Sequence, residues 1–166
     1  MKHLACLLSI VLCAVLSYGQ METRDTPLKV TMCQLYEHPE QYAGKMVEVR
    51  ANVSGNDLAL DDFSNQKSCS VYMKLHLELP QKTTPAAGFD MVQGDAYNEL
   101  LEKLHRGMNV IATYEGRFDP LFVWRDQKRV RVGEGSDKGY GKNHRYDGRI
   151  VLRKVSDVLA RSVPRR

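Results

Sequence analysis

The chain has 166 residues, of which 43% are hydrophobic and 27% charged, a composition that excludes a disordered or low-complexity protein and is ordinary for a globular one. Its formal net charge of +4 is unevenly distributed, because residues 121–166 carry a net of +8 and residues 1–120 a net of −4. This asymmetry indicates either an anionic partner or a solvated basic end of the chain.

The N-terminus is typical of a secretory signal peptide. Lys2 and His3 precede a largely apolar run of thirteen residues, Leu4–Leu16, and Ser17–Gly19 follow as a cleavage region with small residues. A helix of that length is too short to cross a bilayer core of about 30 Å. We therefore expect cleavage near Gly19, no transmembrane anchor, and a secreted or periplasmic mature protein.

Two cysteines, Cys33 and Cys69, remain after this cleavage. An oxidising compartment favours a disulfide between them. Two buried free thiols are the alternative. A zinc site is the weakest interpretation, because no CxxC or HxxxH spacing supplies further ligands.

The first predicted element is a short helix that begins at Thr31. Thr31 and Gln34 have the spacing of a capping box, in which each side chain satisfies the other residue's backbone N–H. Pro39 interrupts the helix, since the residue before a proline avoids helical geometry, and it can begin a second turn. Gly44 is placed to end that turn in the left-handed conformation.

Three strands are predicted next, at Lys45–Val53, Leu58–Asp62 and Cys69–Leu79, because apolar and polar residues alternate in them. Gly55-Asn56 supplies a turn between the first two strands, and Pro80 ends the third. The residues expected to face the core are Val47, Val49, Ala51, Val53, Val71, Met73, Leu75, Leu77 and Leu79.

The hydrophobic period then changes to that of a helix. Tyr97, Leu100, Leu101 and Leu104 recur at helical spacing, with Asp95 and Gly107 placed to cap the two ends, as read from the sequence.

Two further strands follow this helix, at Asn109–Phe118 and Arg149–Val158. The alternation of the last strand slips near Arg153-Lys154, which predicts a bulge.

Three strands, a helix and two strands form the element order of the OB-fold, a five-stranded barrel. We therefore expect a mainly β protein with some α: a five-stranded OB-fold-like barrel, with a helix between strands three and four and a short leading helix. The predicted segments are a signal peptide at 1–19, a polar lead-in at 20–30, the domain at 31–160 and a basic tail at 161–166.

One motif within this domain suggests a resemblance. Its residues are Cys33, Leu35, Pro39, Tyr42, Gly44, Lys45, Val47, Val49 and Arg50. This pattern, together with GYGKNHRYDGRIVLRKVSDV near the C-terminus, resembles small exported bacterial OB-fold proteins of unassigned function. The resemblance covers about Thr31 to Val158; it implies the fold and export, and no ligand or activity.

The connection between the last two strands, residues 119–148, is far longer than the usual two to six residues. It mixes aromatic rings with cations, the combination that single-strand nucleic-acid binders use. The candidate binding residues are Trp124, Arg129, Arg131, Tyr140, Lys142, His144 and Arg145. The alternative is a solubilising arm whose aromatic side chains pack back on the barrel.

Signals for catalysis are weaker. Asp61 and Asp62 are adjacent, so on a strand they point to opposite faces. The histidines are scattered, and none stands beside a plausible nucleophile. We expect no catalytic residues, metal or cofactor.

The sequence thus predicts a non-catalytic binding module for an anionic polymer or surface: nucleic acid, acidic glycan or an envelope component. A protein-interaction domain of the cell envelope, using the Lys45–Asp62 hairpin, is the first alternative. A hydrolase is the second.

Overall fold

The computed structural model describes residues 26–54, 58–61, 69, 73–79, 89–133 and 138–161. The predicted signal peptide, the lead-in up to residue 25 and the tail beyond residue 161 lie outside the described residues. So do Asp62, Val71 and the predicted turn at Gly55-Asn56.

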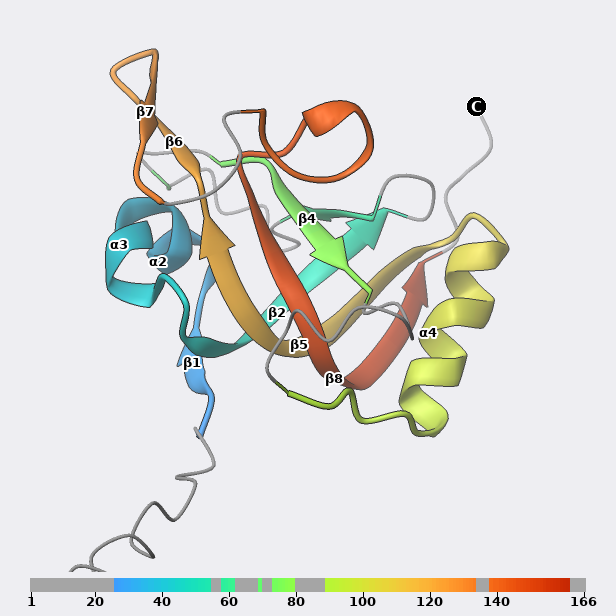
Figure 1. Cartoon of the computed structure of the whole chain (residues 1–166). Helices are drawn as coiled ribbons and strands as arrows, with labels where there is room; N and C mark the ends of the chain where they lie inside the picture. The colour runs from blue at the N-terminus through green and yellow to red at the C-terminus, as the bar shows by residue number, and fades with distance from the viewer. Residues whose placement is uncertain are drawn as a thin grey trace, which may run out of the picture.

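The domain is a closed barrel of five strands (Figure 1). The strands are β2 (Met46–Ser54), β3 (Ala59–Asp61), β4 (Leu75–Glu78), β5 (Asn109–Pro120) and β8 (Gly148–Arg161). They pair in the order β2-β3-β4-β8-β5, and β5 pairs again with β2 to close the ring. The pairing of β4 with β8 is parallel and the others are antiparallel. The predicted fold class is confirmed.

The core lies inside this ring and follows the alternation read from the sequence. On β2, Val47, Val49, Ala51 and Val53 are all buried. Tyr114 on β5 is fully buried as well, and its hydroxyl donates a hydrogen bond to the carbonyl oxygen of Val110 at 3.1 Å, which satisfies its polar atom.

The bulge predicted near Arg153-Lys154 is confirmed. Glu115 of β5 pairs with Lys154, but the next residue, Gly116, pairs with Leu152, so Arg153 is the extra residue of β8. Such a bulge increases the local twist and lets a long strand curve around a small barrel.

Helix α4 (Asp95–His105) packs along β8 and β5, at the right of Figure 1. Leu100 and Leu104 are its buried residues. One prediction is wrong here: Gly94, not Asp95, is the N-cap residue, and Asp95 is the first residue of the helix. An acidic side chain in a first turn still stabilises the positive end of the helix dipole.

The end of the predicted lead-in contains a strand. Leu28–Val30 form strand β1, which pairs in parallel with Val47–Val49 of β2. The three residues are too few to show a periodic pattern, so only the unfilled edge of β2 makes this segment a strand.

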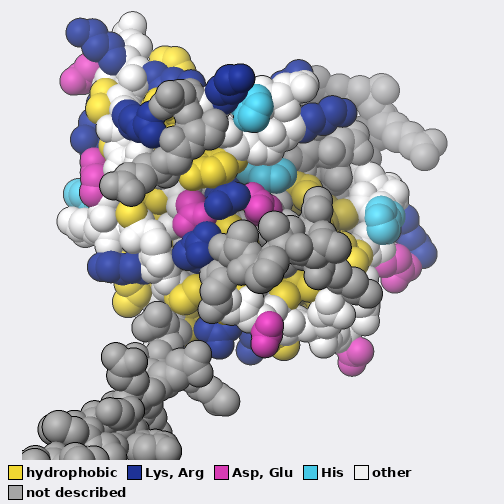
Figure 2. Space-filling view, viewed as in Figure 1, with side chains coloured by type: hydrophobic (Ala, Val, Ile, Leu, Met, Phe, Trp, Pro, Cys, Tyr) yellow, Lys and Arg dark blue, Asp and Glu magenta, His cyan; other side chains and the backbone are white. Residues whose placement is uncertain are grey.

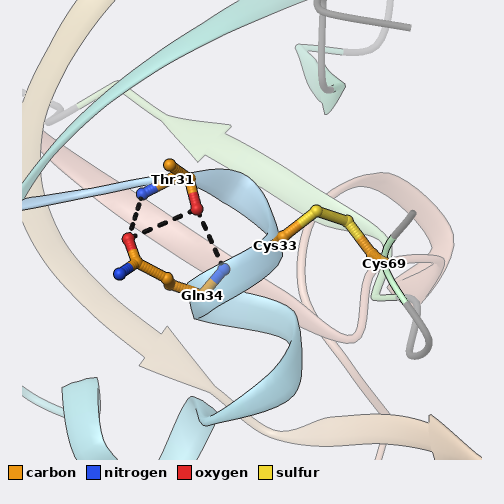
Figure 3. The surroundings of a disulfide bond; sticks show 4 residues. All are labelled: Thr31, Cys33, Gln34 and Cys69. Atoms are coloured by element: carbon orange, nitrogen blue, oxygen red, sulfur yellow. Dashed lines mark hydrogen bonds between the residues drawn. A yellow bond between two sulfur atoms is a disulfide. The ribbon is translucent and has the colours of Figure 1, made fainter. Parts of the chain in front are cut away.

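Two short helices, α2 (Met32–Glu37) and α3 (Pro39–Tyr42), follow β1. The Thr31–Gln34 capping box is confirmed, and its hydrogen bonds appear in Figure 3. The predicted disulfide is also confirmed: Cys33 of α2 is bonded to Cys69, with the two Cα atoms 5.2 Å apart. It fastens the N-terminal helix to the chain just before β4.

Among the described residues, no helix is long and apolar enough to cross a membrane.

Candidate functional site

The long connection between β5 and β8 is largely folded. Its described residues form two parts: a hairpin of β6 (Phe122–Arg125) and β7 (Lys128–Arg131), and a compact loop over residues 138–147 that contains a 3-10 turn at Lys142–His144. Both lie at the upper end of the barrel in Figure 1.

The hairpin turns at Asp126 and Gln127, whose φ angles of 48° and 60° match the type I′ turns that favour two-residue hairpins. Its strands pair Phe122 with Arg131 and Trp124 with Arg129. Because side chains alternate along a strand, these four lie on one face of the hairpin. The guanidinium of Arg129 lies 3.8 Å from the centroid of the Phe122 ring.

Asp147, directly before β8, joins the hairpin to the barrel. Its carboxylate is almost fully buried and accepts hydrogen bonds from Nε of Arg129 at 2.8 Å, Nε1 of Trp124 at 3.2 Å and the backbone N–H of Lys74 at 3.2 Å. Its own carbonyl oxygen accepts from the backbone N–H groups of Leu121 and Phe122. A buried carboxylate requires such partners, so Asp147 is a structural anchor.

The compact loop closes on itself through Tyr140 and Tyr146, whose backbones exchange two hydrogen bonds. Gly141 has a φ of 67°, and a Cβ atom there would lie 2.6 Å from the Tyr146 ring. Only glycine fits both the backbone conformation and this close approach.

The loop lies on the outer face of β4 and β8. Tyr146 packs against His76 of β4, with ring centroids 5.0 Å apart, and the guanidinium of Arg149 lies 4.6 Å from the Tyr140 ring centroid. Burial raises the pKa of the Tyr140 hydroxyl above its ordinary value.

A network of charges lies beneath this loop. Arg149 binds Asp119 at 2.9 Å and Glu78 at 2.7 Å, and Arg117 binds the same Asp119 at 2.8 Å. Both carboxylates, Asp119 and Glu78, therefore already have cationic partners. This arrangement is expected of an ion-pair network that holds β4, β5 and β8 together, whereas a general base needs a carboxylate that is available to accept a proton.

A pocket of about 210 Å³ opens where β3, β4 and the compact loop meet. Its described lining residues are Ala59, Leu60, Asp61, Lys74, Leu75, Arg145 and Tyr146. We call it the Lys74–Arg145 pocket. In OB-folds the face of strands two and three and the loop between strands four and five bind ligands, and β3, β4 and the β5–β8 connection are those elements here.

The charge of this pocket is positive. Among the described residues, no hydrogen-bond or ion-pair partner contacts the side chains of Lys74 or Arg145, both of which are exposed. Asp61 is the one carboxylate among the described lining residues, and desolvation raises its pKa above the ordinary value. Figure 2 shows Lys and Arg side chains along the upper part of the visible face, over the hairpin and the connection to β8.

The seven candidate residues of the sequence analysis fall into three groups. Arg145 lines the pocket, with Lys142 and His144 exposed on the same loop. Trp124, Arg129 and Arg131 lie on one face of the hairpin. Tyr140 is partly buried against Arg149, away from the described pocket lining.

Sequence reasoning missed Asp61, Lys74, Tyr146 and Asp147. Asp61 and Lys74 do stand at solvent-facing positions of the predicted strands, which was the available signal. Their meeting depends on the pairing of β3 with β4, which no local pattern reveals.

The fold and site together define this chain as an OB-fold-like barrel with an elaborated connection between its last two strands. No protein-family model, curated protein or solved structure matches the chain. The resemblance to small exported OB-fold proteins stays an expectation.

Proposed function

We propose that this protein is an exported, non-catalytic binding module that takes an anionic polymer at the Lys74–Arg145 pocket and the adjoining hairpin. The observation that carries the proposal is the position of Lys74 and Arg145, two cations with no partner among the described residues, at a pocket on the β3–β4 face bordered by the β5–β8 connection.

The size of the pocket supports a polymer over a small-molecule ligand. Pockets for drug-sized ligands are usually about 300–1,000 Å³. At about 210 Å³ this one is smaller, so it suits a single unit or charged group. The remainder of a longer ligand would lie on the surface outside the pocket. Exposed cations lie there on the compact loop (Lys142) and on the hairpin (Lys128).

Export is part of the same proposal. The N-terminal segment has the pattern of a signal peptide, and the Cys33–Cys69 disulfide is of the kind that persists in oxidising compartments.

Binding to heparin and to an oligonucleotide, measured across a range of salt concentrations, tests the proposal. Lys74→Gln and Arg145→Gln should each weaken binding, and each lost phosphate contact should reduce the slope of log affinity against log salt by about 0.7 for a single strand. Lys154→Gln is the matched control, because Lys154 is an exposed lysine on β8 beyond the residues that pair with β4.

The control should behave as the wild type. Absence of retention on either polyanion at low salt would overturn the proposal, and so would equal losses for all three variants.

A further inference from the structure

Resting on the proposed function, we infer that the polymer is a single-stranded nucleic acid and that the indole ring of Trp124 stacks on one of its bases.

The indole is both accessible and fixed. Trp124 is 40% exposed, although it is a large aromatic residue, and its ring nitrogen donates to the buried carboxylate of Asp147 at 3.2 Å. A partly exposed ring that is held at its polar edge loses little conformational freedom on binding. Stacking on such a ring requires no rearrangement of the hairpin.

The arginine directly opposite the ring is already charge-paired. Arg129, its cross-strand neighbour, is paired with Asp147 and also lies over the Phe122 ring. The guanidinium of Arg129 is therefore less available to bind a phosphate than an unpaired arginine would be. The platform offers an aromatic ring, and the cations that have no partner in the described part of the chain, Lys74 and Arg145, stand at the pocket.

Asp147 brings the platform next to the pocket. The same oxygen, Oδ2, accepts from Trp124 and from the backbone N–H of Lys74, whose side chain lines the pocket. The preceding residue, Tyr146, lines it as well. One extended ligand can thus contact Trp124 on one side of Asp147 and Lys74 and Arg145 on the other.

This separation favours a nucleic acid over an acidic glycan. A nucleotide carries its flat face and its negative charge on different groups, the base and the phosphate. An acidic sugar carries its charge on the ring that would have to stack. An exposed ring whose cross-strand arginine is already paired, with separate cations at the pocket, matches the nucleotide, and stacking platforms next to cationic grooves are how single strands are bound.

The fluorescence of Trp124 provides a direct test, because it is the single tryptophan of the chain. Three probes are compared on the wild-type protein: a short oligothymidylate, an abasic oligonucleotide of the same length, and heparin. We expect the oligothymidylate alone to quench the fluorescence through stacking. It should also bind about 5- to 150-fold more tightly than the abasic strand, the equivalent of one stacked base.

Trp124→Ala should remove that advantage, so that the oligothymidylate and the abasic strand bind equally, while heparin affinity stays unchanged. Val130→Ala is the matched control, because Val130 is 39% exposed on the same hairpin. It should bind all three probes as the wild type does.

Two outcomes would overturn the inference and leave the proposed function intact. In the first, the wild-type protein binds the base-containing and abasic strands equally. In the second, heparin quenches the fluorescence and binds more tightly than the oligothymidylate, which would assign the site to a glycan. If the wild-type protein binds none of the three probes, the proposed function itself is overturned.

Discussion

Nε of Arg129 and Oδ1 of Asp147 lie 2.8 Å apart, and this ion pair joins the tip of a surface hairpin to the start of the last barrel strand. The carboxylate side chain is only 3% exposed and the arginine side chain 34%. With Trp124 and the backbone of Lys74 bound to the same carboxylate, the hairpin, the pocket and the barrel share one anchoring residue.

Asp147→Ala should therefore destabilise the fold by roughly 2–4 kcal/mol, because three donors lose one buried acceptor. Chemical denaturation measures this change. Asp90→Ala, at an exposed aspartate before α4, is the control and should stay within about 0.5 kcal/mol of the wild type. A loss no larger than that of the control would show that Asp147 is not the anchor.

Removing the disulfide should cost roughly 3–4 kcal/mol in the chain-entropy model. The crosslink spans a sequence separation of 36 residues and adds a second covalent attachment of α2 to the domain, besides the backbone. In Cys33→Ser/Cys69→Ser protein the melting temperature should fall by about 10 °C. Calorimetry with and without reductant provides the comparison, and the double variant should be insensitive to the reductant. If reduction leaves the wild-type melting temperature unchanged, the bond contributes no stability.

Polyanion binding should strengthen as the pH falls through the pKa of Asp61. Desolvation raises that pKa above the ordinary value of an aspartate. The carboxyl therefore becomes neutral at a higher pH, where its repulsion of an anion beside Lys74 and Arg145 disappears. Asp61→Asn should bind more tightly at neutral pH. In this variant the polyanion affinity, measured as a function of pH, should no longer rise as the pH falls through the range in which Asp61 titrates. An unchanged pH profile in the variant would place the titrating group elsewhere.

The same shift has a consequence for stability. The pKa of Asp61 is higher in the folded state than in the unfolded state. Its contribution to the free energy of unfolding is therefore fully present below the unfolded-state pKa and is lost as the pH rises through the folded-state pKa. Asp61→Asn should consequently stabilise the protein at neutral pH relative to acid, which denaturation at the two pH values would reveal.

Gly141→Ala should disorder the compact loop and weaken polyanion binding, because a methyl group there meets the Tyr146 ring that lines the pocket. Gly107→Ala is the matched control: Gly107 has a similar φ of 70°, but nothing lies within 4 Å of its added Cβ. The control should show only the cost of the left-handed backbone, roughly 1–2 kcal/mol, with normal binding. Equal binding by the two variants would contradict the role of this contact.

The barrel could be predicted from the sequence because each strand carries its own alternating pattern. Val47, Val49, Ala51 and Val53 had to share a face, and a face of that kind must be buried. The capping box at Thr31 and the bulge at Arg153 were likewise local signals, and the structure confirms both.

The sequence by itself determined the order of the five barrel strands and α4, the core-facing residues of β2, the two cysteines available for a disulfide and the basic character of the β5–β8 connection. Only the tertiary structure decided that Leu28–Val30 form a strand, that Asp61, Lys74 and Arg145 share a pocket, and that Asp147 holds Trp124 in place. The physical reason is that periodicity and capping act between neighbours in the chain. Asp61 and Lys74 meet through strand pairing, and Trp124 meets Asp147 through closure of a long loop; both depend on the whole barrel being formed.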